Sequence, residues 1–312
     1  MTSWPTSWPE LRAASLVHED EAILALNKPA GISVTGERHD TDLVEMAAEH
    51  GERLFPVHRI DKVTSGLVLL ARELRFHGDL TRQFNRRTVE KDYLVVTRST
   101  GLPESGTIDM PLTTGRKNRV RPAGRREDIT RDGEDGRTWS LAPPDPGVEP
   151  SGKRSYPSLT TFARVWEGGG HSFLVVRPIT GRRHQIRVHL AWIGHPIEGD
   201  PLFDRDSAER GDRTRLHSWR LALDVDSPHS RRGVERRRLT APPTEDFLAG
   251  LGEDTVPPPL GELLERAEAA VAGLPEPPEE PAGGPARSDR RPGRRGAGRG
   301  RSSRTRRTGA AG

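Results

Sequence analysis

The sequence predicts an α+β protein built around one mixed or mostly antiparallel sheet. Short apolar segments with strand character outnumber the segments with helical spacing. Two of the strand-like segments, residues 159–166 and 172–177, are joined by Glu167-Gly168-Gly169-Gly170, a turn that suits a hairpin. Because hairpin-joined strands alternate with helical segments along the chain, we expect an α+β architecture.

The first half of the chain gives a clear series of elements. In order they are a strand at 22–26, a helix at 43–47, a strand at 67–71, a helix at 74–84 and a strand at 93–96. The strand at 67–71 is a continuous apolar run, so we expect both of its faces to be buried. Pro29 and Gly31 end the first strand and begin a loop.

Regular structure becomes sparse from residue 99 to 157, where Gly, Pro, Arg and Asp dominate. We expect loop there, with one short strand near Ile108 and a polar insertion at about 113–152. After the hairpin comes a helix in which Ile186, Leu190 and Ile193 form one apolar stripe. Arg187 then projects about 100° away from that stripe and can reach a cleft. A strand at 216–225 and a helix at 260–272 complete the series.

Composition indicates one folded domain with appendages. The chain has 312 residues, of which 32% are apolar and 27 are proline, which is too polar for a core along the whole length. We expect an N-terminal arm at 1–14, one main folded domain at 15–250, a linker and short helix at 251–274, and a disordered Arg/Gly-rich basic tail at 275–312. The net charge is +4, but residues 287–312 hold ten Arg and one Asp, so the preceding body carries −5. RNA or DNA binding by the body must therefore depend on locally placed cations.

Several classes of protein are excluded by what the sequence lacks. There is no cysteine, so disulfides, thiolate nucleophiles and cysteine-bound metals are impossible. No run of about 18 apolar residues and no signal-like N-terminus occurs, so we expect a cytoplasmic protein without membrane association. His184 and His189 are five apart, whereas metal-binding helices place histidines four apart, and we predict no metal site.

Asp61 is the residue on which the functional reading depends. It lies in Val57-His58-Arg59-Ile60-Asp61-Lys62-Val63-Thr64-Ser65-Gly66, between a His-Arg pair and a Thr-Ser-Gly turn that leads into the buried strand. A carboxylate beside such a turn is held in place before any substrate arrives. The alternative is that Asp61 only caps the turn or pairs with Arg59.

This segment resembles the catalytic motif of the RluA-like family of pseudouridine synthases, with Ile60 in place of the usual Leu. Three further segments match family motifs in the expected order: Asn27-Lys28-Pro29-Ala30-Gly31, Lys91-Asp92-Tyr93-Leu94, and Thr180-Gly181-Arg182-Arg183-His184-Gln185-Ile186-Arg187-Val188-His189-Leu190. The likeness covers roughly residues 15 to 230. It implies a long curved sheet that a catalytic cleft divides into halves. No N-terminal RNA-binding module is expected, because only about fifteen residues precede the region of likeness.

The resemblance also implies a reaction and its residues. Uracil is detached from its ribose, turned over and rejoined through carbon 5, with no cofactor. Asp61 is the implied catalytic carboxylate and must be ionised, which burial disfavours and a nearby cation favours. The resemblance assigns that cation to Arg187, the base platform to Tyr93 and help with base extrusion to Arg59. As further substrate-binding candidates we name His58, Thr64, Arg182 and Gln185.

The RNA target is not encoded in these motifs. We expect a monomer that acts on ribosomal RNA, with transfer RNA as the second choice. A non-catalytic RNA-binding or assembly factor with the same fold stays open. A glycoside hydrolase would need two carboxylates flanking the bond to be cleaved, and the motifs offer one.

Overall fold

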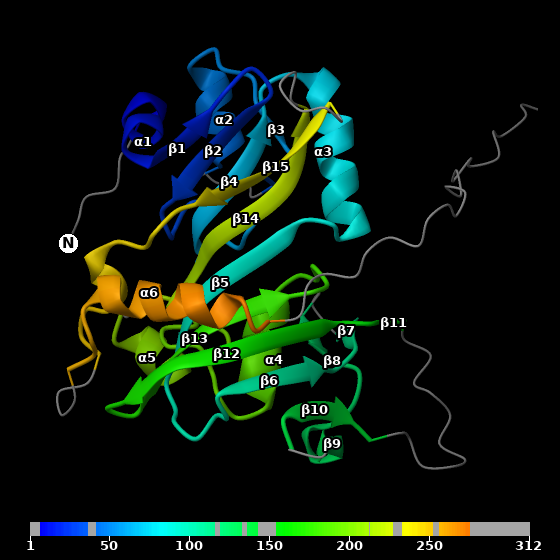
Figure 1. The fold of residues 1–312 in the computed structure, drawn as a ribbon, viewed down its shortest axis with the longest axis vertical. Helices are drawn as coiled ribbons and strands as arrows, with labels where there is room; N and C mark the ends of the chain where they lie inside the picture. The colour runs from blue at the N-terminus through cyan, green and yellow to red at the C-terminus, as the bar shows by residue number, and fades with distance from the viewer. Residues whose placement is uncertain are drawn as a thin grey trace, which may run out of the picture. The chain divides into compact units, whose positions relative to one another are not determined.

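The computed structural model describes residues 7–36, 42–115, 119–132, 136–142, 154–211, 213–226, 233–251 and 256–274 (Figure 1). The predicted basic tail lies outside these residues, as do residues 116–118, 133–135 and 143–153 of the predicted insertion.

A twelve-stranded sheet runs through the described chain. Along its main path the strands are β1 (Leu16–Glu19), β2 (Ile23–Lys28), β4 (Ser65–Ala71), β14 (Leu216–Asp226), β5 (Glu90–Thr97), β13 (His171–Pro178), β12 (Leu159–Gly168), β6 (Ser105–Asp109), β10 (Thr138–Leu141) and β9 (Ile129–Asp132). Two more strands pair beside this path, β3 (Phe55–Pro56) with β4 and β15 (Val234–Thr240) with β14. Neighbours are antiparallel except for β4 with β14 and β6 with β10. The α+β class and the mostly antiparallel sheet are confirmed.

The sheet is continuous, and its two halves meet at a short parallel pairing. β4 and β14 are in register only at Ser65 with His217 and at Gly66 with Ser218. Further along β14, β15 replaces β4 as the neighbour. This short seam follows directly after the loop that carries Asp61.

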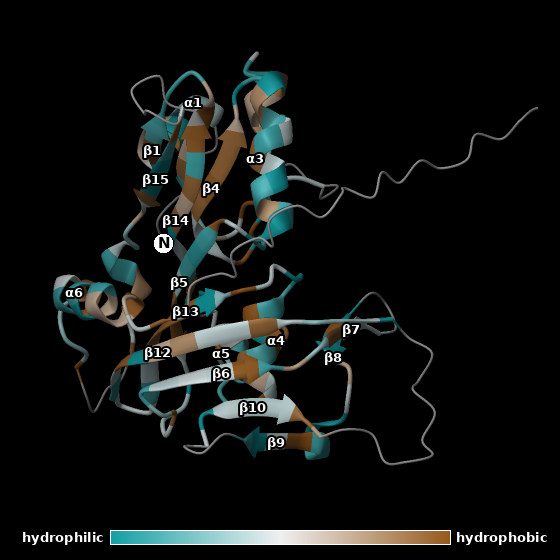
Figure 2. Cartoon of the chain, turned by 45° about the vertical axis from the view of Figure 1, so that its right-hand side comes forward, coloured by the Kyte–Doolittle hydropathy of each residue, from teal (hydrophilic) through white to brown (hydrophobic). Residues whose placement is uncertain are grey.

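Helices cover both faces of each half. In the first half, α1 (Trp8–Ser15) and α2 (Leu43–Glu49) lie on one face and α3 (Leu74–Arg86) on the other. Strand β4 alternates between the two sides, and all seven of its residues are buried, which confirms the prediction from its apolar run. In Figure 2 it is hydrophobic along its length, whereas much of α3 is hydrophilic.

The second half has the same plan. Helix α4 (Gln185–Trp192) packs on one face of β5, β13 and β12. Helix α6 (Leu260–Val271) packs on the opposite face through Leu263 and Ala267. The predicted short helix is therefore part of the core rather than an appendage. A short helix, α5 (Arg205–Glu209), precedes β14.

The short strand expected near Ile108 is present as β6. Two other predictions about the periphery are wrong. The stretch expected to be loop also holds β9 and β10 of the main sheet, and β7 (Leu112–Thr114) pairs with β8 (Val120–Pro122) and β11 (Ser155–Tyr156) in a second sheet. These strands lie towards one edge of the fold and bury few side chains, so their sequences are polar. Their core consists of a few apolar contacts, such as that between the rings of Trp139 and Phe162, whose centroids are 5.8 Å apart. The expected N-terminal arm contains α1, whose Trp8 and Leu11 are buried against the sheet.

Two fully buried histidines lead to a prediction about acid stability. The His189 ring contacts the Thr160 hydroxyl through Nδ1 and the Met110 carbonyl through Nε2. The His217 ring likewise contacts the Ser65 hydroxyl through Nδ1 and the Ala241 carbonyl through Nε2. Burial lowers the pKa of His189 and of His217 to about 4. Since both values lie below the ordinary one, the unfolded chain binds more protons at mildly acidic pH, and stability falls as the pH is lowered.

We expect each of these two histidines to lower the free energy of unfolding by about 1.5 kcal/mol when the pH falls from 6.5 to 5. Urea unfolding across this range measures the loss. A His189→Asn variant, although less stable overall, should show a shallower dependence on pH. An unfolding midpoint that is the same at pH 7 and pH 5 would contradict the prediction.

Candidate active site

The loop between β3 and β4 holds Asp61 in a fixed turn. The Thr64 N–H donates to the Asp61 carbonyl at 3.0 Å, and the Gly31 N–H donates to the Lys62 carbonyl at 2.7 Å. The segment that begins at Asn27 therefore braces the loop from the other side. These backbone contacts place the carboxylate before substrate binds, as the sequence predicted.

Gly66 allows the seam beside this turn to close. Its φ of +105° lies in the left-handed region, and a Cβ there would lie 2.2 Å from the backbone oxygen of Ser218. Any side chain would push β14 away from β4. Gly31 also has a positive φ, +94°, but a Cβ at that position would meet nothing within 4 Å.

The two glycines form a matched pair for a test. Gly31→Ala carries only the cost of a left-handed alanine, about 1–2 kcal/mol. Gly66→Ala carries that cost and an additional overpacking cost of about 1–3 kcal/mol, because β14 must move. Chemical denaturation of both variants measures the difference. Equal losses of stability would show that the seam tolerates a side chain.

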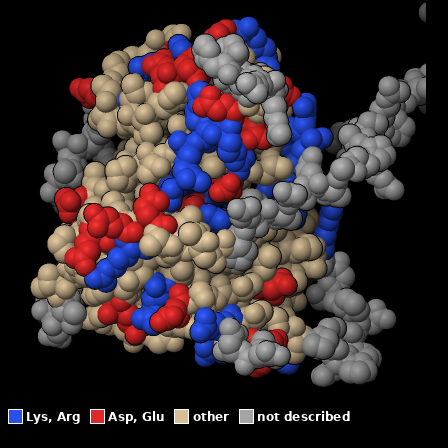
Figure 3. All heavy atoms as spheres, viewed as in Figure 1, with Lys and Arg blue, Asp and Glu red and all other residues tan. Residues whose placement is uncertain are grey.

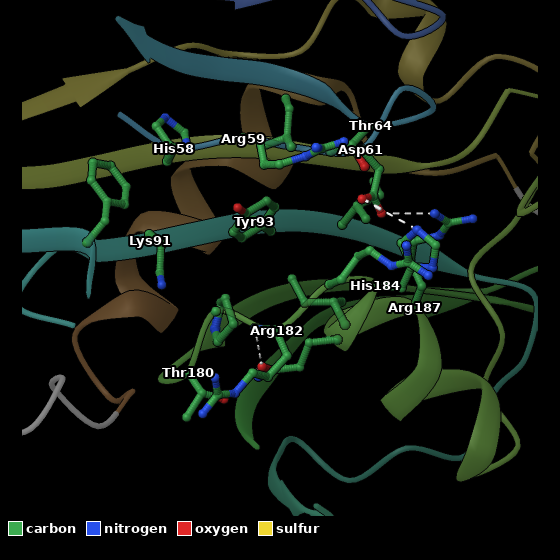
Figure 4. Close-up of a pocket in the computed structure, with 18 of the residues that line it drawn as sticks. His58, Arg59, Asp61, Thr64, Lys91, Tyr93, Thr180, Arg182, His184 and Arg187 are labelled. Atoms are coloured by element: carbon green, nitrogen blue, oxygen red, sulfur yellow. Dashed lines mark hydrogen bonds and ion pairs between the residues drawn. The ribbon is translucent and has the colours of Figure 1, made fainter. Parts of the chain in front are cut away.

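Arg187 joins two carboxylates, Asp61 and Asp200, and Figure 4 shows its contact with Asp61. Its Nη1 donates to Asp61 Oδ2 at 2.9 Å. On the other edge, Nε and Nη2 donate to the two oxygens of Asp200 at 2.7 and 2.8 Å. The predicted pairing of Arg187 with Asp61 is therefore present in the structure. The bidentate pairing fixes the orientation of the planar guanidinium and aims one N–H at Asp61.

The two carboxylates bound to Arg187 differ in how far they are buried. The side chains of Arg187 and Asp200 are 3% and 0% exposed, whereas that of Asp61 is 20% exposed. Burial alone would lower the pKa of Arg187, but the hydrogen bonds and charge of Asp200, and then those of Asp61, raise it above the ordinary value. The guanidinium thus stays charged, and Asp61 is the one of the two carboxylates that a ligand in the cleft can reach.

Two further polar residues of this site, Asp200 and His184, were not named as site residues from the sequence, although His184 lies inside the matched segment at 180–190. His184 lies with Nε2 3.7 Å from Asp61 Oδ1, and its φ of +55° is rare for a residue with a side chain. Burial lowers the pKa of His184, with Arg187 and Arg183 acting in the same direction and Asp61 opposing them. His184 is therefore a second polar side chain beside the Asp61 carboxylate, in addition to Arg187.

Tyr93 lies between the two ends of the cavity (Figure 4). It projects from β5 and contacts the apolar clusters of both halves of the sheet. Burial, together with the charges of Asp61 and Asp92, raises the pKa of Tyr93 to about 12, although the Ser218 hydroxyl acts in the opposite direction. The phenol is therefore protonated at neutral pH, and its ring forms part of the cavity wall.

The candidates in the Asp61 loop occupy different positions. Arg59 is exposed at the cavity and, among the described residues, forms no ion pair, so it is available to a ligand. Thr64 is 2% exposed and supports the turn. The His58 Nε2 accepts from the Leu69 N–H at 2.9 Å while the ring stacks on Phe84. Burial and then Lys91 lower the pKa of His58 to about 3, so the ring is neutral.

Gln185 and Arg182 stand at the start of α4. The Gln185 amide oxygen accepts from the Thr180 hydroxyl and the Arg182 N–H, and its nitrogen donates to Leu159 and Thr160. All four hydrogen-bonding positions of this amide are filled by the protein, so Gln185 positions the helix. Arg182 lines the cavity, with its guanidinium 5.2 Å from the centre of the Tyr156 ring.

The cavity between these groups has a volume of about 440 Å³, within the range typical of small-ligand sites. Asp61, Arg187 and His184 lie at one end and Lys91, Thr180 and Arg182 at the other (Figure 4). In the described part of the chain, no group of three His, Asp or Glu side chains is arranged to bind a metal. No helix among the described residues is long and apolar enough to cross a membrane.

Comparison with known proteins agrees with this geometry. The sequence profile described as RNA pseudouridylate synthase matches residues 22–192. The ribosomal large subunit pseudouridine synthase D of Nitrosomonas europaea is 32% identical over 232 residues, which are 69% of this chain and 58% of that protein. The dual-specificity RNA pseudouridine synthase RluA of Vibrio parahaemolyticus is 33% identical over 226 residues, 70% of this chain and 81% of that protein.

The fold is shared with a solved structure as well. Human RNA pseudouridylate synthase domain containing 4 superposes with a TM-score of 0.58 at 22% identity, over 84% of this chain and 95% of that one. This likeness shows the pseudouridine synthase fold. Together with the profile match and the two bacterial relatives, it shows that the chain belongs to the RluA-like family of RNA pseudouridylate synthases.

Proposed function

We propose that this protein converts specific uridines in structured RNA to pseudouridine, with ribosomal RNA as the first candidate substrate. The observation that carries the proposal is the contact of Arg187 with Asp61, which holds a reachable carboxylate at one end of a cavity with room for a nucleobase. The ribosomal assignment draws support from the Nitrosomonas relative, whose name specifies the large ribosomal subunit.

The reaction is an isomerisation, so it needs no external reactant. The bond from ribose C1′ to uracil N1 breaks, the base turns over, and C1′ is joined to C5. The proton on C5 is lost and N1 gains one, which balances the step. Asp61 either attacks the sugar or the base covalently, or removes a proton from the sugar, and both routes require an ionised carboxylate. Arg187, fixed from behind by Asp200, stabilises that charged form.

Two further residues act on the base. Tyr93 offers its ring as the platform on which uracil stacks, with its hydroxyl available near C5. A target uridine must leave its helix to reach this cavity. Arg59, exposed at the cavity, helps to hold the displaced neighbours.

A non-catalytic RNA-binding or assembly role is the competing hypothesis. It predicts that a cell lacking this protein is rescued equally well by the wild type and by Asp61→Asn. The catalytic hypothesis predicts that only the wild type restores a modified uridine.

The test is to map pseudouridine in ribosomal and transfer RNA by carbodiimide labelling and primer extension. RNA from a deletion strain is compared with RNA from the same strain carrying the wild type or Asp61→Asn. Loss of one position in the deletion and in the Asp61→Asn strain identifies the substrate. Transfer RNA must be included because one relative is named dual-specificity. If every modification persists and the purified protein modifies none of these RNAs, the proposal fails.

We also propose that the protein acts as a monomer in the cytoplasm. Asp61, Tyr93 and Arg187 line one cavity, so the proposed chemistry needs no residue from a second copy. Light scattering of the purified protein, with and without RNA, tests the monomer. A dimer that dissociates only when activity is lost would contradict it.

A further inference from the structure

We propose that the end of the cleft opposite Asp61 binds a phosphate group of the substrate RNA, with Lys91 as the central contact and Arg182 and Arg87 beside it. This inference rests on the proposed function, since it assigns a second part of the substrate to the same cleft.

Lys91 is a buried cation without a partner. It is 8% exposed and lines the cavity, yet among the described residues its ammonium group forms no ion pair or hydrogen bond. In Figure 4 the side chain extends from β5 towards the turn that contains Thr180 and Arg182. Buried lysines are rare unless they are paired. An unpaired one that faces a cavity indicates that its partner is a ligand.

The acidic residues nearest to Lys91 in the sequence are used elsewhere. Glu90 contacts Arg236, and Asp92 forms a two-point pair with Arg177 on the opposite face of β5. Asp61, at the far end of the cavity, is held by Arg187. Among the described residues, no carboxylate forms an ion pair with Lys91.

Arg182 lines the same end of the cavity, and Arg87 is close enough to act electrostatically on both Lys91 and Arg182. Burial and then the charge of Arg87 lower the pKa of Lys91 to about 8. Burial and then Arg87 also lower the pKa of Arg182, with Arg154 adding to the effect and Tyr156 opposing it. His58, on the loop before β4, is neutral at physiological pH. Within the described chain, neither Arg87 nor Arg182 has a carboxylate partner. The cations therefore repel one another until an anion enters.

Many surface cations elsewhere have acidic neighbours. On the face shown in Figure 3, most of the Lys and Arg side chains lie near Asp or Glu. Strand β15 illustrates this, because Arg236 pairs with Glu90 and Asp224, and Arg237 with Asp20. Unlike these paired surface cations, the Lys91 end of the cleft has positive charge in excess.

The spacing along β5 fits one nucleotide. Lys91 and Tyr93 are two residues apart on the same face of the strand, which separates them by about 7 Å. A ribose separates a nucleobase from its phosphates by a comparable length. A uracil stacked on Tyr93 with its C1′ near Asp61 can thus direct a phosphate to Lys91. Among anions, phosphate is the group that every RNA substrate carries.

NMR of the lysine side chains tests this directly. The chain has only five lysines, so a protein labelled at lysine Cε and Nζ gives few signals, and Lys91→Arg identifies the signal of Lys91. Its pKa is measured in the free protein and then with millimolar uridine 5′-monophosphate, uridine 3′-monophosphate, uridine or inorganic phosphate. We expect a rise of about one pH unit or more with at least one nucleotide, and none with uridine.

Each outcome of the titration either supports or refutes the phosphate site at Lys91. A rise with only one of the two nucleotides shows which phosphate of the target residue is held. If neither nucleotide shifts the pKa, or if uridine shifts it equally, the inference is wrong. A response to inorganic phosphate without a response to either nucleotide also overturns it, because the site would then hold a free anion and not the RNA strand.

Enzyme kinetics provide a second test of the phosphate site. Lys91→Met is expected to raise KM for RNA about tenfold with a smaller effect on kcat, since one charge-assisted contact to a phosphate is lost. Lys91→Arg should restore most of the affinity. A purely structural lysine predicts instead that both variants lose thermal stability and that KM follows the folded fraction.

The two proposals fail separately. If pseudouridine forms but Lys91 does not respond to nucleotides, only the phosphate site is refuted. If Lys91 responds but no RNA is modified, only the proposed function is refuted.

Discussion

Asp61→Asn is expected to reduce pseudouridine formation by at least about 10⁴-fold, the scale typical of removing a nucleophile or an essential base. Asparagine has the same shape, and its amide oxygen can still accept from Arg187 Nη1. It can neither attack carbon as a carboxylate nor take up a proton. Loss of tritium from RNA labelled at uridine C5 measures the rate, because that hydrogen leaves in the reaction.

The control for this variant is a carboxylate outside the cleft. Asp79 on α3 is 70% exposed and pairs with Arg82, so Asp79→Asn should leave the rate unchanged. Asp61→Asn should also keep the RNA affinity and the unfolding midpoint of the wild type. Tritium release by Asp61→Asn at near the normal rate would remove Asp61 from the mechanism.

Arg187→Met is expected to abolish activity and to lower the free energy of unfolding by about 3–5 kcal/mol. Methionine fills a similar volume but leaves the 0% exposed carboxylate of Asp200 without its cation. Asp61, at 20% exposure, can still be hydrated, so most of the stability loss should come from Asp200. Denaturant unfolding and tritium release measure the two effects.

A second substitution separates stability from catalysis. In Arg187→Met combined with Asp200→Asn, the buried charge is gone, so a large part of the lost stability should return. Activity should not return, because no cation faces Asp61. If the double variant regains activity, Arg187 serves only to hold the scaffold together. If it regains no stability, the cost of the single variant lies in packing and not in an unpaired charge.

The sequence alone determined the central elements. Strands β2, β4, β5, β12, β13 and β14 and helices α2, α3, α4 and α6 correspond to apolar runs or helical stripes whose periods are local properties of the chain. The stripe of α4 also gave the direction of Arg187. The pairing of Arg187 with Asp61 joins residues 126 positions apart, and it came from the likeness to a family rather than from local pattern.

Tertiary contacts alone decided the rest. The edge strand β9 and its neighbour β10 are too polar to show a period, because they bury few side chains and gain their stability from pairing with neighbouring strands. The sequence assigned no specific role to Asp200, and it offered Lys91 only as the first residue of a matched motif. Their roles depend on the contacts made in the folded chain. Asp200 is paired with Arg187, whereas Lys91 has no ion-pair partner among the described residues. Burial makes that difference large, since a charge removed from water must find its counter-charge in the protein or in a ligand.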